Sequence, residues 1–406
     1  MSSMTLSKAR QVDRPPAVCI IVEDLPVPFD RRVWQEACAL WEAGYRVSVI
    51  CRKGKDYGAS YERIAGIDIY RHGIWEASSP FGYLIEYSMA LAAEFVLALK
   101  AYRRTRFRIL HACNPPDTIF LIGLFFKLLG VRFIFDHHDL NPELFEAKFH
   151  RKGFFHRLLL LAERLTYHTA TVAIVTNESY REIAITRGGK RPERVFIVRS
   201  CPDLKTYHIA APRPELRQGK NLLVVYLGTM GPQEGVDLLI ASIELIVRLK
   251  KRYDTHFALI GGGTEVPRLK EMVAERNLDS WVTFTGRIPD DELAAYLSTA
   301  DVCVAPDPYN EMNDKSTMNK ILQYMAFARP VVLFDLTEGR RSAGDAALYA
   351  KPNDPADLAQ KLLILLDSEP LRRQMGERGR KRIEEGLNWE AEKKWLLHAY
   401  EAALKK

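Results

Sequence analysis

The chain has 406 residues, of which 47% are apolar and 27% are charged, so it is long enough for two or three globular domains and excludes a disordered or fibrous protein. Its net charge of +7 lies in the first 200 residues, while the rest is close to neutral, which indicates an anionic partner for one half. Phosphate groups or an anionic membrane surface fit this charge. Nucleic acid is not expected as a partner, because no DNA- or RNA-binding signature accompanies the basic residues.

Neither a membrane span nor a secretory signal is expected. The most apolar stretches, 81–99 and 118–131, contain charged residues and fall short of the roughly 18 uncharged residues that a spanning helix needs. The first 16 residues lack an apolar core. The six cysteines form no CxxC pair and lie mostly in or beside apolar runs, as reduced thiols do. We therefore expect a cytoplasmic protein, and the basic half suggests a peripheral position on the inner face of the plasma membrane.

Short apolar runs alternate with helical patterns along the whole chain, as in proteins built from βαβ units. The runs predicted as strands are 18–23, 47–51, 67–70, 109–113, 132–136, 171–176 and 194–198, then 222–228, 256–261, 282–286, 302–306 and 330–335. Helical patterns lie between them, for example at 31–43, 236–252 and 289–299. Several runs are nearly continuous in Val, Ile and Leu, which is typical of parallel strands buried on both faces. The sequence therefore predicts an α/β protein with two Rossmann-like doubly wound parallel-sheet domains that face a cleft, joined by a Pro-rich linker at 201–220.

The loop after the first strand leads into the first helix. Asp30 is a good N-cap for this helix, and Arg31 and Arg32 follow at its start. The two arginines either meet an anionic acceptor group or are solvated helix charges, and the sequence leaves both interpretations open.

A second polar segment, Phe135–Leu140, contains His137 and His138 between two aspartates. A metal site is disfavoured here, because adjacent side chains of an extended chain point to opposite faces. The other interpretations are a histidine that faces a sugar or phosphate and a histidine with a structural hydrogen bond.

In the second half, Gly261–Gly263 end a strand ahead of the helix predicted at 267–276. Residues without side chains allow a phosphate to approach the backbone N–H groups at a helix start, but a tight turn has the same composition.

The densest polar segment is Pro306–Ala326. We expect a helix in it with Ser316 as the N-cap, which would offer free N–H groups and the positive end of its dipole to an anion. Lys320 lies one turn into this helix and Gln323 lies three residues further on. The segment therefore predicts an anion-binding site.

Two further stretches combine basic and apolar residues. Residues 151–170 place an apolar stripe beside basic residues, and 100–108 contain Arg103, Arg104 and Arg106. The stripe consists of Phe154, Leu158, Leu161 and Leu165. A helix of this kind binds membrane surfaces, but a helix that faces a core has the same pattern, and we favour the core-facing interpretation.

Together these segments resemble the GT-B glycosyltransferases of family 4, in particular the bacterial subgroup that assembles exopolysaccharides and cell-surface glycans. The resemblance covers about residues 17–400 and rests on PFDRRVWQEACAL, CNPPD, FDHHDLNPELF, FTGRIPDDEL, PDPYNEMNDKSTMNKILQYMA and a final NWE. It implies an acceptor domain at 1–205, a nucleotide-sugar donor domain at 206–385 and a C-terminal helix at 386–406 that returns to the first domain. It also implies retaining transfer of a sugar from a nucleoside diphosphate sugar to a glycan or lipid-linked acceptor, with no metal or other cofactor.

The resemblance assigns the site residues as follows. The family's donor-sugar histidine matches His138, and Lys320 is expected to stabilise the departing diphosphate, so both are assigned to catalysis. The residues assigned to the donor are Gly228, Gly262, Gly263, Arg287, Asp314, Lys315, Ser316, Thr317 and Gln323. Those assigned to the acceptor are Asp30, Arg31, Arg32 and Asn114. The leaving phosphate, rather than a protein base, is expected to accept the acceptor's proton.

The chain departs from the family pattern at four positions. The paired glutamates of the family correspond to Lys315 and Gln323, and the arginine and lysine that hold the diphosphate correspond to Thr229 and Glu234. We therefore expect phosphate binding to move to Lys315, Lys320 and the backbone of 316–319. Two alternatives stay open: a nucleotide-sugar 2-epimerase on the same fold, and a transferase-like binding protein without turnover. The polar segment 313–320 favours an active enzyme.

Overall fold

The structure is a computed structural model that describes residues 16–73, 80–149 and 152–405. The chain divides into two compact units. The first contains 1–136, 165–173 and 400–406, and the second contains 137–164 and 174–399. The predicted domain boundaries at 205 and 385 stay predictions.

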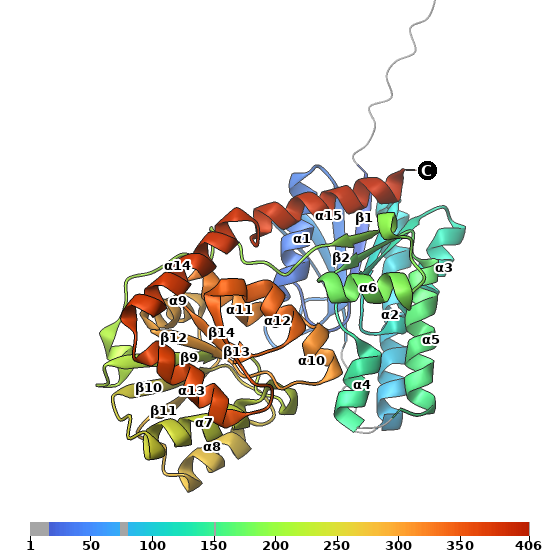
Figure 1. Ribbon diagram of the computed structural model, residues 1–406. Coiled ribbons are helices and arrows are strands. Elements are labelled where there is room, and N and C mark those ends of the chain that lie inside the picture. Colours follow the sequence, from blue (N-terminus) through green and yellow to red (C-terminus); the bar gives the residue numbers. More distant parts are fainter. Residues whose placement is uncertain (1–15, 74–79, 150–151, 406) are drawn as a thin grey trace, which may run out of the picture. The chain divides into compact units, whose positions relative to one another are not determined.

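The first sheet has eight strands in the order β3-β4-β2-β1-β5-β6-β7-β8. Figure 1 labels β1 and β2 of this sheet. Strands β1, β2, β4, β5 and β6 pair in parallel, and β3 pairs antiparallel with β4. Every strand predicted in this half is present, and β3 is an addition that the sequence analysis missed. The bounds are β1 Ala17–Val22, β2 Arg46–Arg52, β3 Tyr61–Ile64, β4 Ile67–His72, β5 Ile109–Cys113, β6 Arg132–His137, β7 Val172–Val175 and β8 Val195–Ile197.

The second sheet has six parallel strands in the order β11-β10-β9-β12-β13-β14. The chain winds outward from β9 in one direction and then from β12 in the other, so the strand order reverses between β9 and β12, where open α/β sheets bind ligands. The prediction of doubly wound α/β domains is confirmed, and only β14 was missed here. The bounds are β9 Leu222–Leu227, β10 Thr255–Ile260, β11 Val282–Gly286, β12 Val302–Ala305, β13 Val331–Phe334 and β14 Ala347–Ala350.

Helices fill the connections between the strands. In the first half they are α1 Arg31–Glu42, α2 Pro80–Thr105, α3 Phe120–Leu128, α4 Asn141–Phe149, α5 Phe154–Thr169 and α6 Glu178–Thr186. In the second half they are α7 Val236–Glu244, which continues as a π-helical turn at Leu245–Leu249, α8 Val266–Glu275, α9 Asp290–Thr299, α10 Glu311–Lys315, α11 Asn319–Ala326, α12 Thr337–Ala343, α13 Pro355–Leu366, α14 Glu369–Glu385 and α15 Trp389–Leu404. Within the described ranges, none of these helices combines the length and apolar character needed to cross a membrane.

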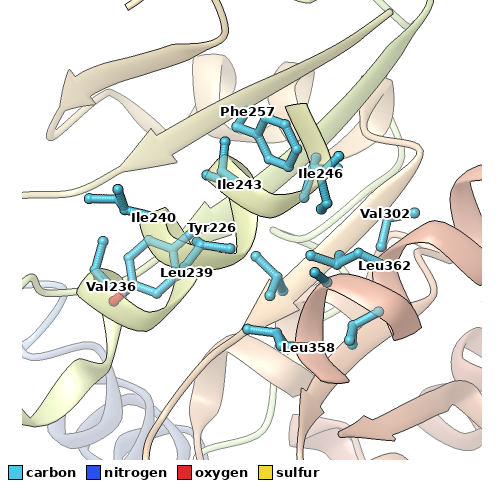
Figure 2. Packing of buried hydrophobic residues seen from close by; sticks show 14 of the residues in the cluster. Tyr226, Val236, Leu239, Ile240, Ile243, Ile246, Phe257, Val302, Leu358 and Leu362 are labelled. Atoms are coloured by element: carbon cyan, nitrogen blue, oxygen red, sulfur yellow. The ribbon is translucent and has the colours of Figure 1, made fainter. Parts of the chain in front are cut away.

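The two faces of the second sheet build two separate cores, because side chains alternate along a strand. Val224 and Tyr226 of β9 pack with α7, α8 and α13 in one core. Figure 2 shows how Leu239, Ile240 and Ile243 of α7 and Leu358 and Leu362 of α13 contribute to it. Leu223 and Val225 face the other core, which contains residues of α9, α11 and α14. The sheet is thus buried on both faces, as its apolar strands predict.

The segment 201–220, predicted as a linker, contains one 3-10 turn, Pro214–Arg217, and otherwise no helix or strand. It is nevertheless packed, since Cys201 and Tyr207 are buried in the core on the α9–α11 side of the second sheet. At the end of the chain, Tyr400–Lys406 belong to the first compact unit. The hydroxyl of Tyr400 lies 2.6 Å from Nδ1 of His111 on β5, so the last helix returns to the first sheet, as the family resemblance implies.

The stripe on α5 corrects one expectation. Its four residues were expected to face a core, but all of them are exposed, from 39% for Leu165 to 76% for Phe154. The sequence pattern alone gives the same stripe for a buried and for an exposed helix, which is why the core-facing interpretation was wrong.

Candidate functional site

A buried lysine lies where the strand order of the second sheet reverses. Lys320, in the first turn of α11, places Nζ 2.8 Å from a carboxylate oxygen of Asp307, which follows β12, and 2.9 Å from one of Glu234, which follows β9. The lysine side chain is 9% exposed and that of Asp307 is 3% exposed. The loops after β9 and β12 therefore meet at one ammonium group.

The electrostatics of this cluster follow from its burial. Burial alone would lower the pKa of Lys320, but Asp307, Tyr226 and Glu234 raise it well above its ordinary value, so Lys320 is charged. Burial also raises the pKa of Glu234. The charge of Lys320 partly offsets this rise, and the charge of Asp307 adds to it. One cation is thus shared by two carboxyl groups.

Aromatic and glycine residues fix the position of the lysine. Nζ of Lys320 lies 5.0 Å from the centre of the Tyr226 ring, and the hydroxyl of Tyr226 donates to the carbonyl of Thr229. At Gly228, a Cβ atom would lie 2.9 Å from the Tyr226 hydroxyl and 3.2 Å from Cε of Lys320. A side chain at this position would therefore displace the lysine.

The glycine turn after β10 is tightly packed at two of its glycines and open at the third. Gly261 has φ +130° and a Cβ atom there would lie 1.9 Å from the carbonyl oxygen of Gly228, so this glycine is required by close packing of the two loops. A Cβ at Gly263 would lie 2.3 Å from the carbonyl oxygen of Met230. Gly262, however, has open space at its Cβ position and is exposed. Among the described residues, the N–H groups of 262–264 donate no backbone hydrogen bond, so they are available to an anion.

The start of the helix that carries Lys320 corrects another prediction. Ser316 is not its N-cap. A short helix, α10, precedes it with Asn310 as the N-cap, and Ser316 ends α10, with its hydroxyl donating to the carbonyl of Met312 at 2.7 Å. Helix α11 begins at Asn319, so Ser316 and Lys320 do not lie on one helix. Both Asn310 and Ser316 are good capping residues, and the sequence could not show which one starts a helix.

Several residues predicted to bind a donor have internal partners. The carboxylate of Asp314 accepts hydrogen bonds from the N–H and hydroxyl of Thr337 at the start of α12. Lys315 pairs with Glu311 at 2.6 Å. Gln323 donates to the hydroxyl of Tyr207 at 3.0 Å, which leaves its amide oxygen as an acceptor.

Asn177, which caps α6, holds the same segment from its other side. Its side-chain N–H group donates to the carbonyl of Lys315 at 2.9 Å and lies 3.1 Å from the hydroxyl oxygen of Thr317. Because this one amide contacts both the last residue of α10 and a residue of the loop after it, it fixes the path between α10 and α11. Sequence analysis did not single out Asn177.

The two histidines after β6 differ in environment. His137 is buried, with Nε2 3.8 Å from Glu163 and its ring packed against Tyr180. His138 is half-buried. Arg287, which follows β11, is exposed.

The residues assigned to an acceptor lie in the first compact unit. Asp30 caps α1 through a hydrogen bond from Val33 at 3.0 Å, as predicted. Arg31 is exposed. Asn114 is buried and donates to Asp117 at 2.8 Å.

Arg32 is mostly buried and pairs with two carboxylates. Its guanidinium contacts both carboxylate oxygens of Asp136, at 2.9 and 3.1 Å, and Glu36 at 3.2 Å, and its side chain is 9% exposed. Both interpretations of Arg32 from the sequence were therefore incomplete, because its partner Asp136 lies more than 100 positions away.

Sequence analysis missed the two carboxyl partners of Lys320. Asp307 was visible as a polar residue directly after a strand, and Glu234 was noted only as a departure from a family pattern. No signal in the sequence pairs either of them with Lys320, because the three residues come from different loops.

Two family models match the chain. Residues 30–200 match a model described as "Glycosyl transferase 4-like domain", and residues 221–368 match "Glycosyl transferases group 1". Together they cover most of the chain and correspond to the two sheets.

Curated relatives are moderately similar. The chain is 24% identical to the MMP alpha-(1->4)-mannosyltransferase of Mycolicibacterium hassiacum, over 75% of this chain and 72% of that protein. It is 25% identical to the alpha-D-kanosaminyltransferase of Streptomyces kanamyceticus, over 53% of this chain and 56% of the relative, and 30% identical to the uncharacterized glycosyltransferase MJ1178 of Methanocaldococcus jannaschii, over 41% and 44%. The chain thus spans about half the length of the latter two relatives.

Solved structures share the fold. A sucrose-phosphate synthase from Thermosynechococcus elongatus has a TM-score of 0.75 at 21% identity, and covers 95% of this chain and 98% of its own. Anabaena HepE, solved in complex with UDP and glucose, has a TM-score of 0.72 at 13% identity, with 95% and 100% coverage. At these identities the likeness concerns the fold.

We expect Lys320→Met to lower the free energy of unfolding by about 3–5 kcal/mol at neutral pH, because it leaves two carboxylates buried without their cation. The loss should shrink as the pH falls, since protonation then removes the uncompensated charge and Glu234 already has a raised pKa. Urea unfolding at several pH values measures both effects. Lys381→Met is the matched control, because its partner Glu385 is 67% exposed, and its cost should stay below about 1 kcal/mol. Equal effects of the two variants would contradict this description of the cluster.

Proposed function

Because the chain belongs to family 4 of the GT-B glycosyltransferases, we propose that it transfers a sugar from a nucleoside diphosphate sugar to a hydroxyl group of a glycan or lipid-linked acceptor. The proposed transfer retains the anomeric configuration and needs no metal ion at the donor diphosphate. The role we propose for it is the assembly of cell-surface polysaccharide in the cytoplasm.

The observation that carries this proposal is the position of Lys320. A charged ammonium group lies at the reversal point of the second sheet, beside the glycine turn whose N–H groups at 262–264 are open. A cation and a row of backbone N–H groups are the elements that bind a diphosphate. The same groups would stabilise the charge that develops on the diphosphate as the glycosidic bond breaks.

Glu234 imposes a condition on this binding. In this structure Lys320 pairs with both Asp307 and Glu234. When both carboxyl groups are ionised, the cluster has a net negative charge, and an incoming diphosphate meets that charge. We propose that the donor displaces Glu234 or binds when Glu234 is protonated. Glu234 is the more exposed of the two carboxylates, 19% against 3% for Asp307, which makes it the one that can exchange.

The remaining steps of the proposed reaction require few protein side chains. In the proposed mechanism, His138 positions the donor sugar, and the acceptor oxygen attacks from the side on which the diphosphate leaves. The proton of the acceptor hydroxyl passes to the leaving phosphate oxygen. Lys320 and the open N–H groups hold that phosphate in place, so no protein side chain acts as a nucleophile.

The carboxyl pair also supports one rival. A nucleotide-sugar 2-epimerase needs acid and base groups beside the sugar, and Glu234, with its raised pKa, lies near Asp307 around one lysine. A test of function must therefore separate transfer to an acceptor from epimerisation of the donor alone.

The test incubates the purified chain with UDP-, GDP-, ADP- and dTDP-sugars, each with and without a panel of glycan and prenyl-phosphate-linked acceptors, in the presence of EDTA. We expect one donor to be consumed only with an acceptor, and NMR of the product to show the anomeric configuration of the donor. An inverted product would contradict the retaining mechanism. An epimer formed without an acceptor would establish the rival, and no turnover with clear nucleotide binding would indicate a binding protein.

We expect Glu234→Gln to raise the affinity for the responding nucleoside diphosphate by about threefold to tenfold at neutral pH, because a like charge beside the phosphate is removed. For the native chain, affinity should rise as the pH falls, since the bound diphosphate favours the protonated form of Glu234, and the variant should lose much of this dependence. Isothermal titration at several pH values measures both. Glu377→Gln removes a charge of the same sign that pairs with Arg373 instead and should change little. Weaker binding by Glu234→Gln would show that Glu234 contacts the donor directly.

We also propose that the first compact unit binds an anionic membrane surface. Helix α3 exposes mainly apolar side chains: Leu121, Leu124, Phe125 and Leu128 are 37–81% exposed. Its neighbour α2, whose Phe95 packs edge-on against Phe125 at 4.9 Å, exposes Val96 and ends in exposed Arg103 and Arg104. Exposed apolar residues flanked by basic ones are typical of helices that lie in the membrane interface.

We expect Arg103→Gln to weaken binding to anionic vesicles by about fivefold and Leu128→Gln to weaken it on neutral and anionic vesicles alike. Arg103 is preferred to Arg104 and Arg106, because Arg104 contacts the hydroxyls of Tyr61 and Tyr70 and Arg106 lies over the Tyr102 ring. Vesicle sedimentation measures the effect. Leu249→Gln, at a residue that is 71% exposed in the other unit, is the control and should bind like the native chain. Equal binding by all variants would show that this face is an ordinary solvated surface.

A further inference from the structure

Three ionisable side chains that the proposed reaction does not use meet at the carboxyl edge of the first sheet. Glu23 directly follows β1, His72 is the last residue of β4, and Glu94 lies in the middle of α2. All three belong to the first compact unit. One ligand atom from each residue can be chosen so that all three atoms lie within 4.8 Å of one another.

Glu94 is the unusual member of this cluster. Its side chain is fully buried, and within the described part of the chain neither of its carboxylate oxygens has a hydrogen-bond partner. A buried carboxylate without a partner is costly, so it either takes up a proton or binds a cation.

The histidine is oriented as a ligand would be. Nδ1 of His72 lies 2.9 Å from the carbonyl oxygen of Gly73, so this nitrogen donates its hydrogen to the backbone and leaves Nε2 for another partner. Nε2 faces the cluster and lies 2.8 Å from a carboxylate oxygen of Glu23. A histidine that donates one ring N–H to a carbonyl while the other nitrogen faces carboxylates is typical of metal sites.

A second group of potential metal ligands in the same unit already has partners within the protein. His111, Cys113 and Asp136 are also buried and close together. There, however, the guanidinium of Arg32 already contacts both oxygens of Asp136, and Nδ1 of His111 lies 2.6 Å from the Tyr400 hydroxyl. That group contains its own cation and does not need an ion.

We propose that Glu23, His72 and Glu94 bind one divalent transition-metal ion of the Zn²⁺ or Mn²⁺ type. Two carboxylates and one imidazole suit these ions better than Ca²⁺ or Mg²⁺, which prefer sites made of oxygen alone. Two ionised carboxylates balance the charge of one divalent ion. Three protein ligands leave coordination positions for water or for a hydroxyl oxygen of a bound molecule. This site is separate from the donor site around Lys320, and its existence does not depend on the proposed transfer reaction.

The test measures metal binding by the purified full chain without any nucleotide. After treatment with EDTA and dialysis, Zn²⁺ is titrated calorimetrically, and Co²⁺ is added as a spectroscopic probe. We expect one equivalent of each ion per chain and visible Co²⁺ bands without the near-ultraviolet band of a thiolate ligand, because the proposed site contains no cysteine.

Glu94→Gln should weaken binding at least about tenfold. This variant keeps the shape of the side chain and removes a buried charge, so it should fold. Asp56→Asn is the matched control: it removes the same charge at an exposed residue of the same unit and should bind like the native chain. Cys113→Ser should also bind like the native chain.

Three results would overturn the proposal. Binding of no ion at millimolar concentrations would show that Glu94 is simply protonated and shares its proton with Glu23. Equal affinity of Glu94→Gln and the native chain would place the ion elsewhere. A thiolate band that disappears in Cys113→Ser would assign the ion to the group around His111.

Discussion

The buried ammonium group of Lys320 is the constraint on which the second unit's site depends. A charge at this depth is tolerated only with close partners, and the chain supplies them from two separate loops, Asp307 after β12 and Glu234 after β9. Ion pairs with this one ammonium group therefore connect the start of α11 to the loops that follow the adjacent strands β9 and β12. The packing around it follows from the same requirement: Gly228 has no side chain because the lysine and the Tyr226 ring fill the space, and Gly261 has none because its loop lies against Gly228.

This cluster also gives a physical meaning to the departures from the family pattern. The family resemblance places a lysine at position 234, and this chain has a glutamate there. The structure shows that a lysine from α11 pairs with that glutamate. A cation is thus present between the same strands, although a different element supplies it.

The fold could be predicted from the sequence because the patterns that determine the strands and helices are local. Apolar runs, their spacing and the Asp30 cap are visible within a few residues, and all predicted strands are present. The missed strands β3 and β14 are short, and β3, at an edge of its sheet, has two adjacent charged residues in its four. The site was predicted as a segment but not as a set of contacts. Ser316 was assigned the wrong end of a helix because Asn310 competes for the same role, and Arg32 was misread because Asp136 is distant in sequence. Pairings of this kind exist only after the strands have assembled.

A buried charge needs a partner of opposite sign, and this requirement, which explains the pairing of Lys320, leads to a different conclusion for the cluster around Glu94. Around Lys320, two carboxyl groups surround one protein cation. The charge of Lys320 balances the charge of one carboxylate, and the other carboxyl group, that of Glu234, can take up a proton. Around Glu94, two carboxyl groups lie beside an imidazole that donates to a backbone carbonyl through Nδ1 and places Nε2 2.8 Å from Glu23. Arg32 is the partner of opposite sign for Asp136 in the same unit, which shows that the fold can place an arginine beside a buried acid. Where two acids and a histidine lie together in this way, their charges need either protons or an external cation, and Nε2 of His72, which faces Glu23, is placed to bind that cation.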